Sequence, residues 1–86
     1  MDARIIKAEF EKLARQLGVE IRYTDGGPSG LCTVKGGQVL FLDKMLDTAN
    51  QIEVYVREFR TLDLEGVFVV PIIRRLLGLD SDNTEW

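Results

Sequence analysis

The sequence predicts an α+β fold in which a small antiparallel sheet of three strands packs with three helices. Three observations predict it: an amphipathic helical pattern near the N-terminus, two apolar runs joined by Gly36-Gly37, and a second helical pattern later in the chain. The predicted order is helix, strand, strand, strand, helix, a short segment that is an open candidate for a fourth strand, and helix. Consecutive strands with short links usually pair with each other, which favours the antiparallel arrangement.

The first element is a helix over residues 2–17. Its apolar side chains recur at helical spacing and its charged side chains face away; the apolar set is Ile6, Phe10, Leu13, Ala14 and Leu17. Gly18 stands where a helix usually ends on a left-handed residue. Residues 19–24 then alternate apolar and polar, which predicts a half-buried strand whose Val19, Ile21 and Tyr23 point at the core.

A β-hairpin is the next expectation. Residues 31–35 and 38–43 flank Gly36-Gly37, and glycines accept the positive φ angles of a two-residue hairpin turn. Residues 39–42 have no polar member, which indicates a strand that is central or covered on both faces. The turn predicts the cross-strand pairs Val34–Val39, Thr33–Leu40, Cys32–Phe41 and Leu31–Leu42.

Two helices complete the predicted fold. Thr48 and Gln51 fit a capping box at the start of the first, with Asp47 as the alternative cap. That helix carries apolar residues at helical spacing, namely Ile52, Tyr55, Val56, Phe59 and Leu62. Residues 67–70 are the candidate fourth strand. The last helix is expected over residues 71–77, because a proline suits its first turn and a glycine follows it.

Size and charge narrow the class of protein. A chain of 86 residues supports one hydrophobic core, so we expect a single domain over residues 1–78 and a disordered acidic tail over residues 79–86. The net charge is −3, and three of the 14 acidic residues lie in that tail, so the other 11 balance the 11 Lys and Arg residues. Nucleic-acid binding draws affinity from neutralised phosphates, so a neutral body argues against nucleic acid as a partner.

Composition also removes several kinds of chemistry. Histidine is absent, which excludes mechanisms that need an imidazole as base or metal ligand. The longest uncharged apolar run, residues 67–73, is far shorter than the roughly 20 residues that cross a bilayer. No secretory signal peptide is visible, and a single cysteine cannot pair within the chain. We expect a cytoplasmic protein that is not an enzyme, has no cofactor and does not act at a membrane.

The main ligand-binding candidate is the Gly-rich loop at residues 25–30. It contains the GXXG form of a KH nucleic-acid clamp, but it joins two strands rather than two helices, so a mobile connection is the simpler interpretation. Three residues in or near this loop are candidate ligand-binding residues, namely Arg22, Tyr23 and Ser29.

Other reactive side chains have plain structural interpretations. Cys32 lies within a predicted strand, where a cysteine can act as a small hydrophobic residue, although the sequence leaves its burial open. The carboxylates available for acid–base chemistry or a hard cation are Asp43, Asp47, Glu53, Glu58, Asp63 and Glu65. Solvated surface, turns and caps explain them more simply, so we assign no catalytic residue and no metal ligand.

Residues 64–73 are denser in apolar side chains than a single amphipathic helix requires. The segment either threads the core or leaves part of itself exposed for contact with another chain. Self-association is one way for so small a domain to bury the remainder.

Part of the chain resembles a known family. The run LARQLGVEIRY over residues 13–23, the Gly-rich loop, Leu31-Cys32, Gly36-Gly37 and residues 39–43 are similar to the N-terminal half of ImmA/IrrE-type metallopeptidase-like proteins. That family carries a zinc-binding HExxH motif on the helix that follows, whereas residues 53–59 here read EVYVREF. The resemblance implies a sheet-plus-helix scaffold without the protease chemistry, and we carry over no catalytic residue.

Together these observations predict a non-catalytic protein-interaction or regulatory module that binds a protein partner or a second copy of itself. The alternative is a small-molecule or metal-binding domain that uses the loop at residues 25–30.

Overall fold

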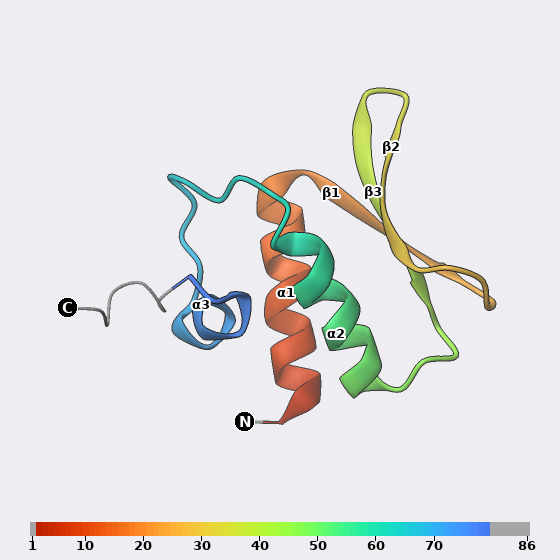
Figure 1. The fold of residues 1–86 in the computed structure, drawn as a ribbon, viewed down its shortest axis with the longest axis horizontal. Helices are drawn as coiled ribbons and strands as arrows, with labels where there is room; N and C mark the ends of the chain where they lie inside the picture. The colour runs from red at the N-terminus through yellow and green to blue at the C-terminus, as the bar shows by residue number, and fades with distance from the viewer. Residues whose placement is uncertain (1, 80–86) are drawn as a thin grey trace.

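The computed structural model describes residues 2–79 (Figure 1). Its elements, in chain order, are α1 (Ala3–Leu17), β1 (Val19–Thr24), β2 (Gly30–Val34), β3 (Gly37–Asp43), α2 (Thr48–Phe59) and α3 (Pro71–Leu77). The α+β class and the order of helices and strands are confirmed. Residues 67–70 are extended but join no sheet, so the candidate fourth strand is absent from the part of the chain described.

The helices and the sheet form separate layers. α1 and α2 pack against each other and against the sheet, α1 mainly on β1 and α2 on β2 and β3. α3 lies against α1 and α2 on the side away from the sheet (Figure 1). The tip of the β2–β3 hairpin projects beyond the helices. Leu40 and Leu42 of β3 belong to the buried core, whereas Val39 and Phe41 lie on the opposite face of the sheet.

Local capping sets the ends of the helices. The Asp2 side chain accepts a hydrogen bond from the Arg4 N–H at the start of α1, and Gly18 ends that helix with φ 74°. Asp47, the alternative cap, begins α2 by accepting a 2.9 Å hydrogen bond from the Asn50 N–H. α2 ends at Phe59, so Leu62, expected on this helix, follows it in a turn.

The sheet is mixed rather than wholly antiparallel. β3 lies in the centre, pairing in parallel with β1 and antiparallel with β2. The prediction of an antiparallel sheet is therefore wrong for the β1–β3 pair, while the central place of residues 39–42 is confirmed. The physical reason is the apolar character of β3 on both faces, because a central strand buries more side-chain surface than an edge strand. The connection at residues 25–29 carries the chain past β3 to its far edge.

The hairpin turn is one residue earlier than predicted. Lys35 and Gly36, with φ 52° and 81°, occupy the turn in place of Gly36-Gly37, as in a type I′ turn. Each side chain keeps its predicted face but faces a different partner. Leu31 lies opposite the buried Leu40, where the predicted register would have placed the polar Thr33. The observed pairs are Gly30–Phe41, Leu31–Leu40, Cys32–Val39, Thr33–Gln38 and Val34–Gly37.

Three aromatic rings occupy the centre of the core between α1 and α2. Phe10 stacks on Tyr55 with ring centroids 5.0 Å apart, and Phe59 meets both rings edge-on. All three side chains are fully buried. Val69 and Ile73 complete the core from the C-terminal segment, so this segment does thread the core.

Of the predicted tail, residues 79–86, the structure describes Leu79 only. The Leu79 N–H donates a 2.9 Å hydrogen bond to the Arg74 carbonyl, and its side chain packs against the core. Leu79 thus belongs to the folded body, so the predicted start of the disordered tail is wrong at this residue, and residues 80–86 lie outside the described part of the chain.

Candidate functional site

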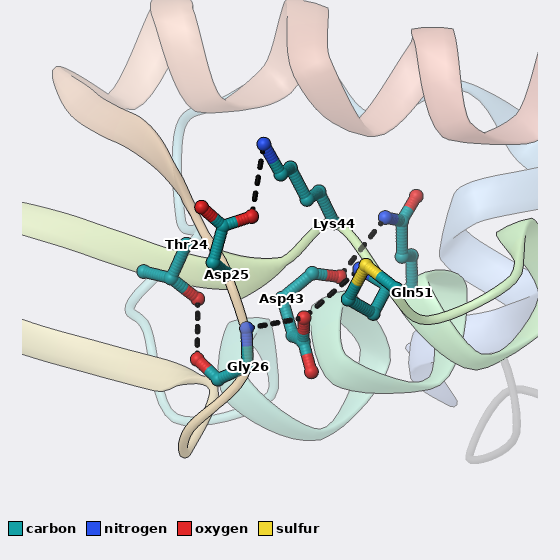
Figure 2. A network of polar contacts seen from close by, with 7 residues as sticks. Thr24, Asp25, Gly26, Asp43, Lys44 and Gln51 are labelled. Atoms are coloured by element: carbon teal, nitrogen blue, oxygen red, sulfur yellow. Dashed lines mark hydrogen bonds and ion pairs between the residues drawn. The ribbon is translucent and has the colours of Figure 1, made fainter.

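The Gly-rich loop is anchored by a polar network centred on Asp43, the last residue of β3 (Figure 2). One carboxylate oxygen of Asp43 accepts hydrogen bonds from the Gly26 N–H at 3.0 Å and the Met45 N–H at 2.9 Å. The Asp43 N–H donates to the Ser29 hydroxyl at 3.0 Å. These bonds join two loops that are distant in sequence, so the connection at residues 25–29 has defined partners.

Further contacts extend this network on both sides. The Lys44 ammonium pairs with Asp25 at 2.9 Å, and the Thr24 hydroxyl donates to the Gly26 carbonyl (Figure 2). Gln51, a buried polar residue of α2, donates from its side-chain amide to the Asp43 carbonyl at 3.2 Å. The network therefore ties the loop to the start of α2.

A shallow hollow of ≈ 370 Å³ lies beside this loop. Cys32 is exposed there, which answers the question that the sequence left open. Thr24 and Ser29 line this hollow, but their hydroxyls are engaged in hydrogen bonds that hold the loop in place. The hollow is lined by Thr24, Gly26, Pro28, Ser29, Gly30, Cys32 and Phe41.

The three predicted ligand-binding residues do not converge. Arg22 and Tyr23 are neighbours on β1 and so point to opposite faces of the sheet. Arg22 pairs with Glu20 at 2.8 Å, and this contact lowers the pKa of Glu20 and raises that of Arg22. Ser29 takes part in the Asp43 network.

Tyr23 lies at the rim of the helix layer rather than in the core. Its side chain is 47% exposed, its hydroxyl donates to Glu11 of α1 at 3.2 Å, and the Lys7 ammonium lies 5.0 Å from its ring centre. The prediction that this side chain points at the core is therefore wrong. β1 ends beside the polar flank of α1, so the side chain at this position meets charged groups.

The buried hydroxyl of Tyr55 lies below this rim. It is the one buried side-chain polar atom within residues 2–79 that lacks a hydrogen-bond partner. Burial raises the pKa of Tyr55, and the nearby Tyr23 and Glu11 add to the shift. Tyr55 therefore stays neutral and acts as part of the aromatic core.

Glu58 at the end of α2 holds the free edge of β2, a contact that the sequence did not indicate. Its carboxylate accepts a 3.0 Å hydrogen bond from the Leu31 N–H and pairs with Arg57 at 2.8 Å. Arg57 also donates to the Ser29 carbonyl at 3.3 Å. The Arg57 guanidinium and the Leu31 N–H lower the pKa of Glu58. This pair protects an edge strand that would otherwise offer unpaired backbone groups.

The lowered pKa of Glu58 predicts a pH-dependent contribution to stability. A carboxylate whose pKa falls on folding stabilises the fold above its usual value of 4.5, and this contribution is lost as pH falls through the lower folded-state value. We expect Glu58→Gln to lower the free energy of unfolding by about 1 kcal/mol near neutral pH, because one charge-assisted hydrogen bond weakens. Urea unfolding of both proteins at about pH 7 and about pH 3 measures this, and a difference that persists at low pH would contradict it.

The remaining carboxylates do not gather into a metal site. Within residues 2–79 no group of three or more Cys, Asp or Glu side chains is placed to hold a metal ion. Asp47 caps α2, and Asp63 accepts a hydrogen bond from the Glu65 N–H in a turn. No helix in this part of the chain has the length and apolar character needed to cross a membrane.

An exposed apolar surface lies between α1 and the segment that leads into α3. Phe68 is 72% exposed there, although the next residue, Val69, is buried. Two hollows of ≈ 200 Å³ and ≈ 360 Å³ adjoin each other, with Glu9 and Val70 lining both. We call this surface the Phe68 groove; its apolar members are Ile5, Leu13, Phe68, Val69, Val70, Pro71, Ile72 and Ile73.

Charged side chains border the Phe68 groove. Glu9 and Lys12 of α1 pair across one turn at 3.4 Å. Arg75 of α3 lines the end near Ile5, which is 51% exposed. Residues 64–73 are therefore divided, since some thread the core and others face solvent.

The chain matches no protein-family model, no curated protein and no solved structure. The similarity to ImmA/IrrE-type proteins therefore stays a prediction.

Proposed function

We propose that this chain is a non-catalytic protein-interaction module that binds a protein partner through the Phe68 groove. The observation that carries the proposal is the exposure of Phe68 beside a groove with apolar walls. An exposed aromatic side chain beside a groove with apolar walls is an arrangement in which interface anchors are commonly found.

The shape of the groove indicates the kind of partner. Its two hollows lie on either side of Val70, so a partner segment that presents two apolar side chains would fill both. Glu9 and Lys12 border the first hollow, and Glu9 and Arg75 border the second, so both signs of charge are available to orient the segment. A short amphipathic segment of a cytoplasmic protein fits this pattern best.

Site-specific photo-crosslinking in cells tests the proposal. A photoreactive phenylalanine analogue at position 68 should yield a discrete adduct with one protein, because the side chain would lie inside the interface. The same analogue at Thr33, an exposed position on the distant hairpin, is the matched control. Adducts of equal yield at both positions, or none at position 68, would contradict the proposal.

Phe68→Ser gives a second readout on the recovered partner. We expect the substitution to weaken binding of the purified partner at least about tenfold, since the loss of a central aromatic anchor costs about 2 kcal/mol or more. The fold should be unaffected, because the side chain is mostly in solvent.

The alternative is a small-molecule or metal-binding domain that uses the loop at residues 25–30, and the hollow beside that loop is the observation in its favour. Its hydroxyls already hold the loop, which makes this proposal the weaker of the two. A chemical-shift screen with nucleotides and divalent ions separates them, because the alternative requires saturable shifts at residues 24–32.

A further inference from the structure

β1 is an edge strand whose outer side is open. Within residues 2–79 its only strand neighbour is β3, and the Thr24 carbonyl accepts a 2.9 Å hydrogen bond from the Lys44 N–H on that side. Backbone groups alternate in direction along a strand, so Glu20 and Arg22 also direct theirs at β3. Val19, Ile21 and Tyr23 therefore direct their N–H and C=O groups at the open edge.

A groove follows this open edge. It has a volume of ≈ 310 Å³ and lies between α1 and β1, where Ala14 and Arg15 form part of the helical wall. Val19, Glu20, Ile21 and Tyr23 line it from the strand, so the groove adjoins the three residues whose backbone groups face the open edge. A sheet edge beside a helix is a site at which an additional extended strand can bind. This groove is separate from the Phe68 groove, which involves the other flank of α1.

We propose that the occupant is β1 of a second copy of this chain, paired antiparallel about a two-fold axis at Ile21. The charge pattern of β1 carries the proposal. Pairing Ile21 with itself places Glu20 of each copy opposite Arg22 of the other, so both charged positions meet opposite charges. Val19 meets Tyr23 on the face that carries the helices. The strand is self-complementary in charge, as a symmetric interface requires.

The backbone directions agree with this register. Val19, Ile21 and Tyr23 form hydrogen-bonded pairs in the antiparallel ladder, and these are the residues whose backbone groups face the open edge. Glu20 and Arg22 then occupy the pairs that are not hydrogen-bonded, where opposing side chains approach most closely. Within one chain Arg22 and Glu20 already pair at 2.8 Å, so the same groups exchange partners between copies.

The dimer would contain one continuous sheet of six strands with both helical layers on the same face, because the two-fold axis is perpendicular to the sheet. It covers the open edge of β1, while Glu58 and Arg57 protect the start of β2 at the other edge. In the dimer, contacts therefore cover the edge at β1 and the start of the edge at β2.

Charge-reversal variants of the full chain test the register. We expect the wild-type protein to approach twice its 9.7 kDa mass in sedimentation equilibrium as concentration rises. Glu20→Arg alone and Arg22→Glu alone place like charges opposite each other, and each should weaken dimerisation roughly tenfold to a hundredfold. An equimolar mixture of the two variants restores both opposite-charge pairs, so it should form a heterodimer of about wild-type affinity.

Four further measurements complete the test. Glu53→Arg, the same change on the exposed face of α2, should leave dimerisation unaltered. Amide exchange at Ile21 and Tyr23 should slow with protein concentration, whereas exchange at Arg22 should not change. Circular dichroism should give the wild-type spectrum for each variant, which checks that each is folded. A wild-type monomer at concentrations on the order of 1 mM, or a mixture no tighter than either variant alone, would overturn the proposal. Phe68→Ser should dimerise normally, so this proposal and the proposed function can fail independently.

Discussion

Phe10→Ala is expected to lower the free energy of unfolding by about 3–5 kcal/mol, the largest effect of any substitution considered. Phe10 is fully buried and contacts both other rings of the aromatic core, with centroids 5.0 Å from Tyr55 and 5.9 Å from Phe59. Its removal leaves a cavity between α1 and α2, because the structure around a deleted core side chain relaxes only partially. A domain of this size has about 5–15 kcal/mol of stability in total, so the variant should be close to unfolding.

Urea unfolding followed by circular dichroism measures this loss. Phe68→Ala is the matched control, because the same atoms are removed from a side chain that is 72% exposed, and we expect a change within about 0.5 kcal/mol. If Phe10→Ala does not fold, Phe10→Leu gives a smaller loss that can be measured in the same way. Similar losses at positions 10 and 68 would contradict the arrangement of the core.

Asp43→Ala is expected to cost about 2–3 kcal/mol, since one carboxylate oxygen holds both Gly26 and Met45. Its removal takes the acceptor from two backbone N–H groups, of which that of Gly26 is partly buried, and weakens the link between the loop at residues 25–29 and the start of α2. Amide exchange at Gly26 should therefore quicken more than the global loss of stability explains. Thermal and urea unfolding give the stability change.

Two substitutions serve as controls for Asp43. Asp43→Asn keeps an amide oxygen that can accept both of these bonds but removes the negative charge that strengthens them, so it should lose about half as much stability as alanine. Asp63→Ala removes a carboxylate that accepts one local hydrogen bond, from Glu65 in an exposed turn, and should cost about 0.5 kcal/mol. Equal losses from Asp43→Ala and Asp63→Ala would show that the network is not a long-range anchor.

Local patterns predicted the helices and strands well. The spacing of Phe10, Leu13 and Ala14 matches the buried face of α1, and Gly18 and Gly78 end their helices with positive φ angles as expected. Such features depend on a few neighbouring residues, so one sequence contains the information that specifies them.

Pairing between strands was harder to predict, because alternation shows which residues share a face and not which strand lies beside it. The parallel pairing of β1 with β3 follows from the central position of β3 in the sheet, which is set by the packing of the whole chain. The turn at Lys35 was not predicted either, because a lysine at φ 52° is locally unfavourable. The turn position is favoured instead by a contact distant in sequence, since it places Leu31 opposite the buried Leu40.

The candidate surfaces were predictable only in part. The apolar density of residues 64–73 indicated exposure of some members, but only the packing shows that Phe68 is exposed while Val69 is buried. Asp43 has no pattern that distinguishes it from a turn residue, because its partners Gly26 and Ser29 are far away in sequence. The sequence shows that Glu20 and Arg22 alternate with apolar residues in β1. Only the edge position of β1 in the sheet makes this pattern relevant to pairing with a second copy.

The mixed order of the sheet also bears on how the chain reaches its folded state. The β2–β3 hairpin closes over a two-residue turn and can form within microseconds, independently of the rest. β1 pairs with residues 19 positions later and can join only once β3 presents its edge. The hairpin is therefore expected to form before β1 docks, and α1, directly connected to β1 through Gly18, completes the aromatic core in that late step.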